Sequence, residues 1–127
     1  AGLMFDGQPV TRPANAGVRR RLAGVPRAAD LDGAWDTRKT GSAAIECALA
    51  AAGVLNVVRF ENVNLWDVAG GVTLLLAAGG RVCVREDGAW HDLETFAAHE
   101  DAPDLRHWRR PMIAGAPDAV AAMCAAA

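Results

Sequence analysis

The chain has 127 residues, a formal net charge of −2 and 52% hydrophobic residues, which suits one compact domain with its own core rather than a disordered segment. The basic residues form no long block, so a nucleic-acid partner is not expected. The apolar stretches are interrupted before the roughly 20 residues that a membrane span needs, and the first residues do not resemble a signal peptide, so we expect no membrane partner and a cytoplasmic protein.

The first elements are short. Asp6-Gly7 is a strong hairpin turn signal, but there is little room for a strand before it, so we expect the chain to start in mid-domain. Helix formers between Ala14 and Ala23 predict a helix that Gly24 and Pro26 would end. The polar segment 26–40 predicts a loop and a short strand.

A helix is predicted next, over residues 41–53. Ser42 or Thr40 can cap its start and Gly53 can end it. Its apolar stripe consists of Ile45, Leu49 and Ala52, with Glu46 pointing elsewhere. The β-branched run 54–60 then predicts a strand.

The following helix, residues 66–78, is apolar nearly all round, which predicts burial on more than one side. Gly70 and Gly71 would each cost about 1 kcal/mol relative to alanine, so we expect a close backbone approach there. Strands are predicted over 81–84 and 111–114, segment 85–108 is ambiguous, and Pro117 with Asp118 opens a terminal helix. This order predicts an α/β fold with helices layered on a mixed or mostly parallel sheet.

Two helix starts carry the candidate functional residues. Asp67 is the one charged residue between Glu61 and Arg81 and lies in the first turn of a buried helix. It can cap that helix, which the residues alone favour, or it can hold a magnesium ion through its carboxylate. Gly41, Ser42 and Ala43 open the earlier helix, where free amides can meet an anion or a sugar hydroxyl, although such residues are usually just a cap.

The order and separation of three segments resemble the C-terminal signature of the inositol monophosphatase family. The segments are Arg38-Lys39-Thr40-Gly41-Ser42-Ala43-Ala44, then Trp66-Asp67-Val68-Ala69-Gly70-Gly71, then Ala77-Ala78-Gly79-Gly80. Residues 2–10 are similar to the hairpin between the two halves of that family, and residues 112–115 to the strand before its last helix. The resemblance covers almost all of residues 1–127, which we treat as a single domain.

This resemblance implies a magnesium-dependent phosphomonoesterase with a layered αβαβα sugar-phosphatase fold, of which this chain is the C-terminal part. Asp67 would match a metal-binding aspartate, and Gly41, Ser42 and Ala43 would match the segment that contacts the polyol part of the substrate. The family's upstream glutamate and its Asp-Pro-x-Asp-Gly-Thr motif do not occur here, so the resemblance implies that the N-terminal catalytic half is missing. It also implies a homodimer of the full protein, and an isolated chain that binds magnesium poorly and has no activity.

One position departs from the family pattern. The family often carries a substrate-contacting glutamate seven residues before the metal-binding aspartate, where this chain has Phe60, and Glu61 follows one position later. Either Glu61 takes the substrate-binding role through a one-residue adjustment, or the substrate is not inositol phosphate. The enzyme would then act on histidinol phosphate, fructose bisphosphate or a phosphoadenosine nucleotide.

A further alternative is a non-catalytic binding or structural module derived from the same fold. Half of a layered domain is expected to expose the faces of its sheet and helices, so such a module would assemble with a partner subunit.

Overall fold

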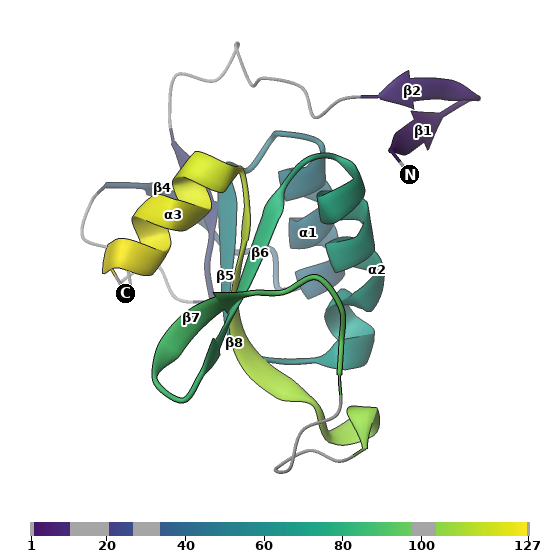
Figure 1. Cartoon of the computed structure of the whole chain (residues 1–127). Coiled ribbons are helices and arrows are strands. Elements are labelled where there is room, and N and C mark those ends of the chain that lie inside the picture. The colour runs from purple at the N-terminus through teal and green to yellow at the C-terminus, as the bar shows by residue number, and fades with distance from the viewer. Residues whose placement is uncertain (1, 11–20, 27–33, 98–103, 127) are drawn as a thin grey trace.

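A six-stranded sheet forms the centre of the computed structural model, which describes residues 2–10, 21–26, 34–97 and 104–126. The strand order is β4-β3-β5-β8-β6-β7 (Figure 1). The strands are β3 (Leu22–Gly24), β4 (Asp36–Arg38), β5 (Val57–Asn64), β6 (Arg81–Glu86), β7 (Ala89–Asp92) and β8 (Arg109–Gly115). β3 runs parallel to β4 and β5, whereas the pairs β5–β8, β8–β6 and β6–β7 are antiparallel. The predicted α/β fold with a mixed sheet is therefore confirmed.

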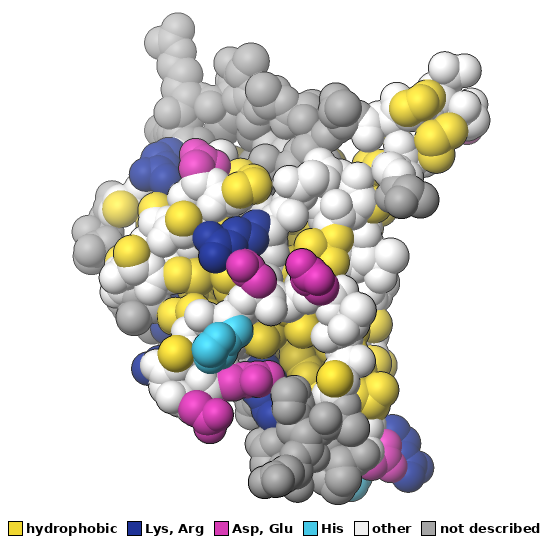
Figure 2. All heavy atoms as spheres, viewed as in Figure 1, with side chains coloured by type: hydrophobic (Ala, Val, Ile, Leu, Met, Phe, Trp, Pro, Cys, Tyr) yellow, Lys and Arg dark blue, Asp and Glu magenta, His cyan; other side chains and the backbone are white. Residues whose placement is uncertain are grey.

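A separate two-stranded hairpin consists of β1 (Leu3–Phe5) and β2 (Gln8–Val10). Asp6 and Gly7 connect the strands with φ angles of 47° and 75°, as a type I′ turn requires, so the predicted turn is confirmed. The hairpin lies apart from the six-stranded sheet (Figure 1) and carries hydrophobic side chains on its surface (Figure 2). Met4 and Phe5 are 56% and 71% exposed.

Helices cover both faces of the sheet. α1 (Ala43–Ala51) and α2 (Leu65–Ala77) lie on one face, and α3 (Pro117–Ala126) lies on the other (Figure 1). Successive strand residues point to opposite faces, so Val58 packs in the core beneath α1 and α2 while Val57 packs beneath α3. The expectation that half of a layered domain leaves the faces of its sheet exposed is therefore wrong for this sheet.

The two helices on the shared face pack closely because one glycine leaves room. A Cβ atom on Gly71 would lie 2.4 Å from Cβ of Cys47 on α1, whereas a Cβ atom on Gly70 would have nothing within 4 Å. The predicted close approach is confirmed at Gly71 and wrong at Gly70.

Two of the predicted helices need correction. Leu22 and Ala23 belong to strand β3 rather than to a helix, because they pair with two parallel neighbours; residues 14–20 of the predicted helix lie outside the described part. The buried face of α1 comprises Glu46, Cys47, Ala50 and Ala51. Ile45, on the predicted stripe, is 53% exposed, because the contact with α2 selects small side chains.

Helix α2 buries one stripe within this chain, formed by Val68, Val72 and Leu75. Trp66 is 63% exposed, so the predicted burial on more than one side is not found within the described part. The remaining predicted strands and the terminal helix are present. The ambiguous segment 85–108 contains β7, whose turn Asp87-Gly88 repeats the signal at Asp6-Gly7, and the short 3₁₀ helix η2 (Leu105–His107). No helix among the described residues is long and apolar enough to cross a membrane.

Candidate functional site

The two helix starts singled out in the sequence lie at the same end of the sheet. β5 connects the end of α1 to the start of α2, so the two helices run in the same direction with the strand returning between them (Figure 1). Helix N-termini carry partial positive charge and free amides. Both ends are therefore suited to binding electronegative groups.

The start of α1 has a defined geometry. Gly41 has a φ of 81°, a conformation that favours glycine. The Ile45 amide donates a hydrogen bond to Oγ of Ser42 at 3.3 Å, and the Ser42 amide donates to Oγ1 of Thr40 at 3.1 Å. The predicted cap at Ser42 is confirmed, and the amides of Ala43 and Ala44 precede the first intrahelical hydrogen bond.

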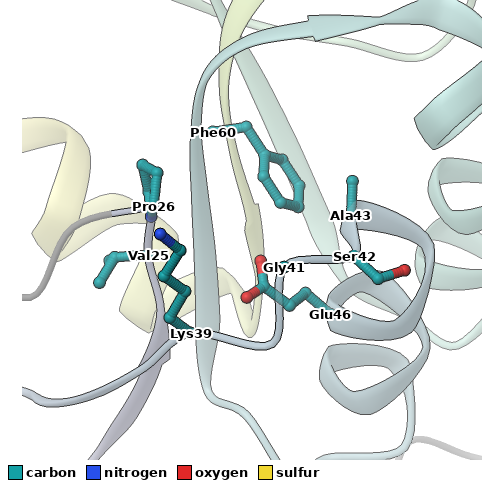
Figure 3. Close-up of a pocket in the computed structure, with 8 residues that line it drawn as sticks. All are labelled: Val25, Pro26, Lys39, Gly41, Ser42, Ala43, Glu46 and Phe60. Carbon is teal, nitrogen blue, oxygen red and sulfur yellow. The ribbon is translucent and has the colours of Figure 1, made fainter.

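A pocket of about 190 Å³ adjoins this helix start. Its lining residues, drawn in Figure 3, are Val25, Pro26, Lys39, Gly41, Ser42, Ala43, Glu46 and Phe60. The structure thus brings together the three residues predicted to contact the polyol. Neither Glu61 nor Asp67 lines this pocket.

Glu46 is the buried polar side chain of the described core, with 5% of its surface exposed. Its Oε1 atom accepts a hydrogen bond from the Thr40 amide at 3.1 Å. Gly24 on β3 leaves space for the carboxyl group, because a Cβ atom there would lie 3.2 Å from Cδ of Glu46. Burial, together with the charge of Glu46, raises the pKa of the neighbouring Cys47 thiol to about 12.

Phe60 and Glu61 occupy different environments on β5. Phe60 is 6% exposed and lines the pocket, whereas Glu61 is exposed. The pairing of β5 with β8 shifts register between Phe60 and Val63, which indicates a β-bulge at this point. A substrate-binding role for Glu61 stays a prediction.

Asp67 is exposed in the first turn of α2 and takes part in a chain of side-chain hydrogen bonds. Its Oδ2 atom accepts from Nδ2 of Asn64 at 3.3 Å, and Oδ1 of Asn64 accepts from Nε of Arg109 at 2.7 Å. Asn64 occupies the N-cap position without a side-chain capping bond. Within the described residues, Asp67 is held by a side chain rather than by the amides of its helix.

Asp67 would suit a magnesium ion as one of several ligands. Its exposed carboxylate offers the oxygen donors that magnesium prefers. Among the residues that the structure describes, no three His, Cys, Asp or Glu side chains come together as a metal site.

Sequence reasoning missed three residues of this region. The apolar stripe of its helix predicts that Glu46 points away from the core, and the preceding polar segment carries no signal that the Thr40 amide needs a partner. Asn64 and Arg109 are 45 residues apart and meet because they are register partners on β5 and β8. Only knowledge of the strand pairing could have joined them.

Known proteins resemble this chain in sequence and in fold. The model of the inositol monophosphatase family matches residues 6–118. The chain belongs to the inositol monophosphatase family. The "Nus factor SuhB" of Xylella fastidiosa is 42% identical over 50 residues, which are 39% of this chain and 18% of that protein.

Solved structures of inositol monophosphatases share the fold. The inositol monophosphatase II of Staphylococcus aureus bound to inositol monophosphate has a TM-score of 0.61 and 17% identity, with 97% of this chain and 48% of that chain covered. The extragenic suppressor protein SuhB of Bartonella henselae has a TM-score of 0.60 and 22% identity, with 99% and 50% covered. The chain therefore spans about half the length of these two structures and less of the Xylella protein.

Proposed function

We propose that this protein is a magnesium-dependent phosphomonoesterase acting on inositol phosphate or a related sugar or polyol phosphate. This chain supplies the polyol-binding side and one metal ligand, Asp67. The observation that carries the proposal is the pocket at the start of α1, which gathers Gly41, Ser42 and Ala43 at the same end of the sheet as Asp67. The S. aureus relative binds inositol monophosphate on the same fold.

The residues of this chain have distinct parts in that reaction. Asp67 holds the metal and is oriented by Asn64, which Arg109 fixes in turn. The start of α1 binds hydroxyl groups of the substrate and so orients the phosphate ester. Magnesium at such a site supplies the activation of the attacking water and the stabilisation of the leaving alkoxide.

An upstream half would contribute the remaining metal ligands and the phosphate-binding residues. The same proposal includes a homodimeric full protein in the cytoplasm. It follows that the 127-residue chain alone should bind magnesium weakly and turn over no phosphate ester.

Two observations each favour an alternative function. Phe60, buried in the pocket where the family often has glutamate, favours a relative that acts on histidinol phosphate, fructose bisphosphate or a phosphoadenosine nucleotide. The sheet covered on both faces favours a non-catalytic binding module that folds without the other half.

A substrate panel separates these functions. The protein encoded by the complete reading frame is assayed for phosphate release from each ester, with magnesium and after chelation. Magnesium-dependent release from inositol phosphate at the highest kcat/KM supports the leading proposal. A preference for another ester selects the matching relative, and the absence of release from all of them supports the binding module.

A further inference from the structure

Two cysteine side chains from distant parts of the chain meet on the face of the sheet that α3 covers (Figure 1). Cys83 lies on β6 and is 1% exposed, whereas Cys124 lies in the last turn of α3 and is partly exposed. Cys124 packs against the hydrophobic cluster that contains Cys83, and a side-chain hydrogen bond joins the two thiols. The pair therefore consists of one buried sulfur and one that a reagent in solution can reach.

Two charged side chains flank the cysteine pair. Asp92 on β7 is the register partner of Cys83, and its Oδ1 atom accepts a hydrogen bond from the Cys83 thiol at 3.4 Å. The same oxygen accepts a hydrogen bond from Nε of Arg81 at 2.7 Å. Burial raises the pKa of the Cys124 thiol and the charge of Asp92 adds to the rise, whereas the hydrogen bond with Cys83 and the charge of Arg81 oppose it. Arg81 thus favours the thiolate of the accessible cysteine, which is the form that reacts.

The third cysteine of the chain lies in the other core. Cys47 is buried between α1 and α2, on the opposite face of the sheet from Cys83 and Cys124. The sheet separates Cys47 from the pair, so a disulfide within the folded chain has one geometrically favoured connectivity. Cys47 therefore serves as an internal control for any oxidation of the pair.

We propose that a low-molecular-weight disulfide oxidises Cys124 and Cys83 to an intrachain disulfide that ties α3 to β6. The Cys124 thiolate attacks one sulfur of glutathione disulfide, and the first glutathione thiolate leaves and takes up the proton that Cys124 lost. Cys83 then loses its proton and attacks the Cys124 sulfur, and the second glutathione leaves with that proton. Two protein thiols are oxidised and one glutathione disulfide is reduced to two thiols.

The proximity of the two sulfur atoms makes the second step possible although Cys83 is mostly protonated, because an intramolecular reaction needs no encounter in solution. Cys83 is closed to reagents and reacts only with a sulfur already bound at Cys124. Disulfides of reducing compartments are usually transient, so the bond is a reversible one. The inference does not depend on the proposed phosphatase function.

The test is incubation of the folded 127-residue chain with glutathione disulfide at pH 8, followed by alkylation and mass spectrometry of a non-reducing digest. We expect a chain about 2 Da lighter through the loss of two hydrogens, with Cys83 and Cys124 in one linked peptide and Cys47 still a thiol. The melting midpoint should rise by roughly 5 °C or more, because the bond closes a long loop. Dithiothreitol should reverse both changes. Cys47→Ala, the matched control, should form the same bond, whereas Cys83→Ala should stop with glutathione attached to Cys124.

Several outcomes overturn the inference. These are a wild-type chain that keeps all its thiols, glutathione that stays on Cys124 without closure, a linked peptide that contains Cys47, and disulfide-bonded dimers in place of the intrachain bond. An unchanged melting midpoint of the oxidised chain would also overturn it, because the bond would then not tie α3 to the sheet. If Cys83→Ala does not fold, the peptide map of the wild-type chain decides alone.

Discussion

The carboxylate of Asp67 is oriented by a neighbour rather than by the backbone of its helix. Asn64 donates to it and in turn accepts from Arg109 across the β5–β8 pair. Groups that orient a metal ligand affect metal affinity although they do not touch the metal. Asn64 is therefore the positioning residue of the proposed magnesium site.

Replacing Asn64 by alanine should weaken magnesium binding in the complete protein by about 10- to 100-fold, the usual effect of losing such a partner. The measurement is the magnesium concentration that gives half-maximal phosphate release. Asn62→Ala, two residues earlier on β5 and exposed, is the matched control and should behave as wild type. Equal magnesium dependence in both variants would show that Asn64 does not position Asp67.

The thiols of Cys47 and Cys83 should be unreactive in the folded chain. Burial raises the pKa of each thiol to about 12, and the thiolate is the reactive form. At pH 8 both remain protonated, so iodoacetamide should modify neither until denaturant is added. Mass spectrometry of the alkylated chain measures this, and rapid labelling of either residue under native conditions would refute it.

The sequence predicts the helix start at the site but not the buried acid beside it. The helix start at Gly41, Ser42 and Ala43 is predictable because a cap is a local pattern, whereas the substrate-binding role of these residues rests on the family resemblance and stays a prediction. The burial of Glu46 is not predictable from an apolar stripe, because it depends on the space beside Gly24 on β3 and on the hydrogen bond from the Thr40 amide.

At the level of elements, the contact between α1 and α2 depends on Gly71. A methyl group there would meet Cβ of Cys47 at 2.4 Å, too close for two carbon atoms. Gly70, its neighbour on the same helix, faces open space. Alanine substitutions at Gly70 and Gly71 therefore distinguish the effect of helix propensity from the effect of packing.

Gly71→Ala should lower the free energy of unfolding by roughly 1–3 kcal/mol, as overpacking usually does. Gly70→Ala should leave it unchanged or raise it by up to about 1 kcal/mol, since alanine favours a helix. Urea unfolding followed by circular dichroism measures both. A loss of stability in Gly70→Ala equal to that in Gly71→Ala would contradict this packing.

The elements themselves were largely predictable because their signals are local. Turn residues located the hairpin at Asp6, and glycine with a capping serine bounded α1. The sequence predicts a helix where β3 lies, because three residues carry no periodicity and the pairing of β3 with β4 and β5 is a tertiary effect.

At the level of the whole molecule, one sheet supports two cores. Leu75 of α2 is fully buried on one face, and Met123 of α3 is 2% exposed on the other. Because the same strands contribute residues to both, the two cores should unfold together.

Leu75→Ala and Met123→Ala should each lower the free energy of unfolding by about 2–5 kcal/mol, the usual cost of such truncations. Both variants should melt in a single transition, whether followed by tryptophan fluorescence or by circular dichroism. Separate transitions would show that the two faces are independent.

We propose that Asp67 holds a catalytic metal together with ligands from an upstream half of the protein. The direct test is phosphate release from inositol monophosphate by the complete protein carrying Asp67→Asn, with Asp118→Asn in the first turn of α3 as the matched control. We expect Asp67→Asn to lose about a hundredfold or more of the turnover, while Asp118→Asn retains it. Wild-type turnover in Asp67→Asn, or turnover by the 127-residue chain alone, would contradict this role of Asp67.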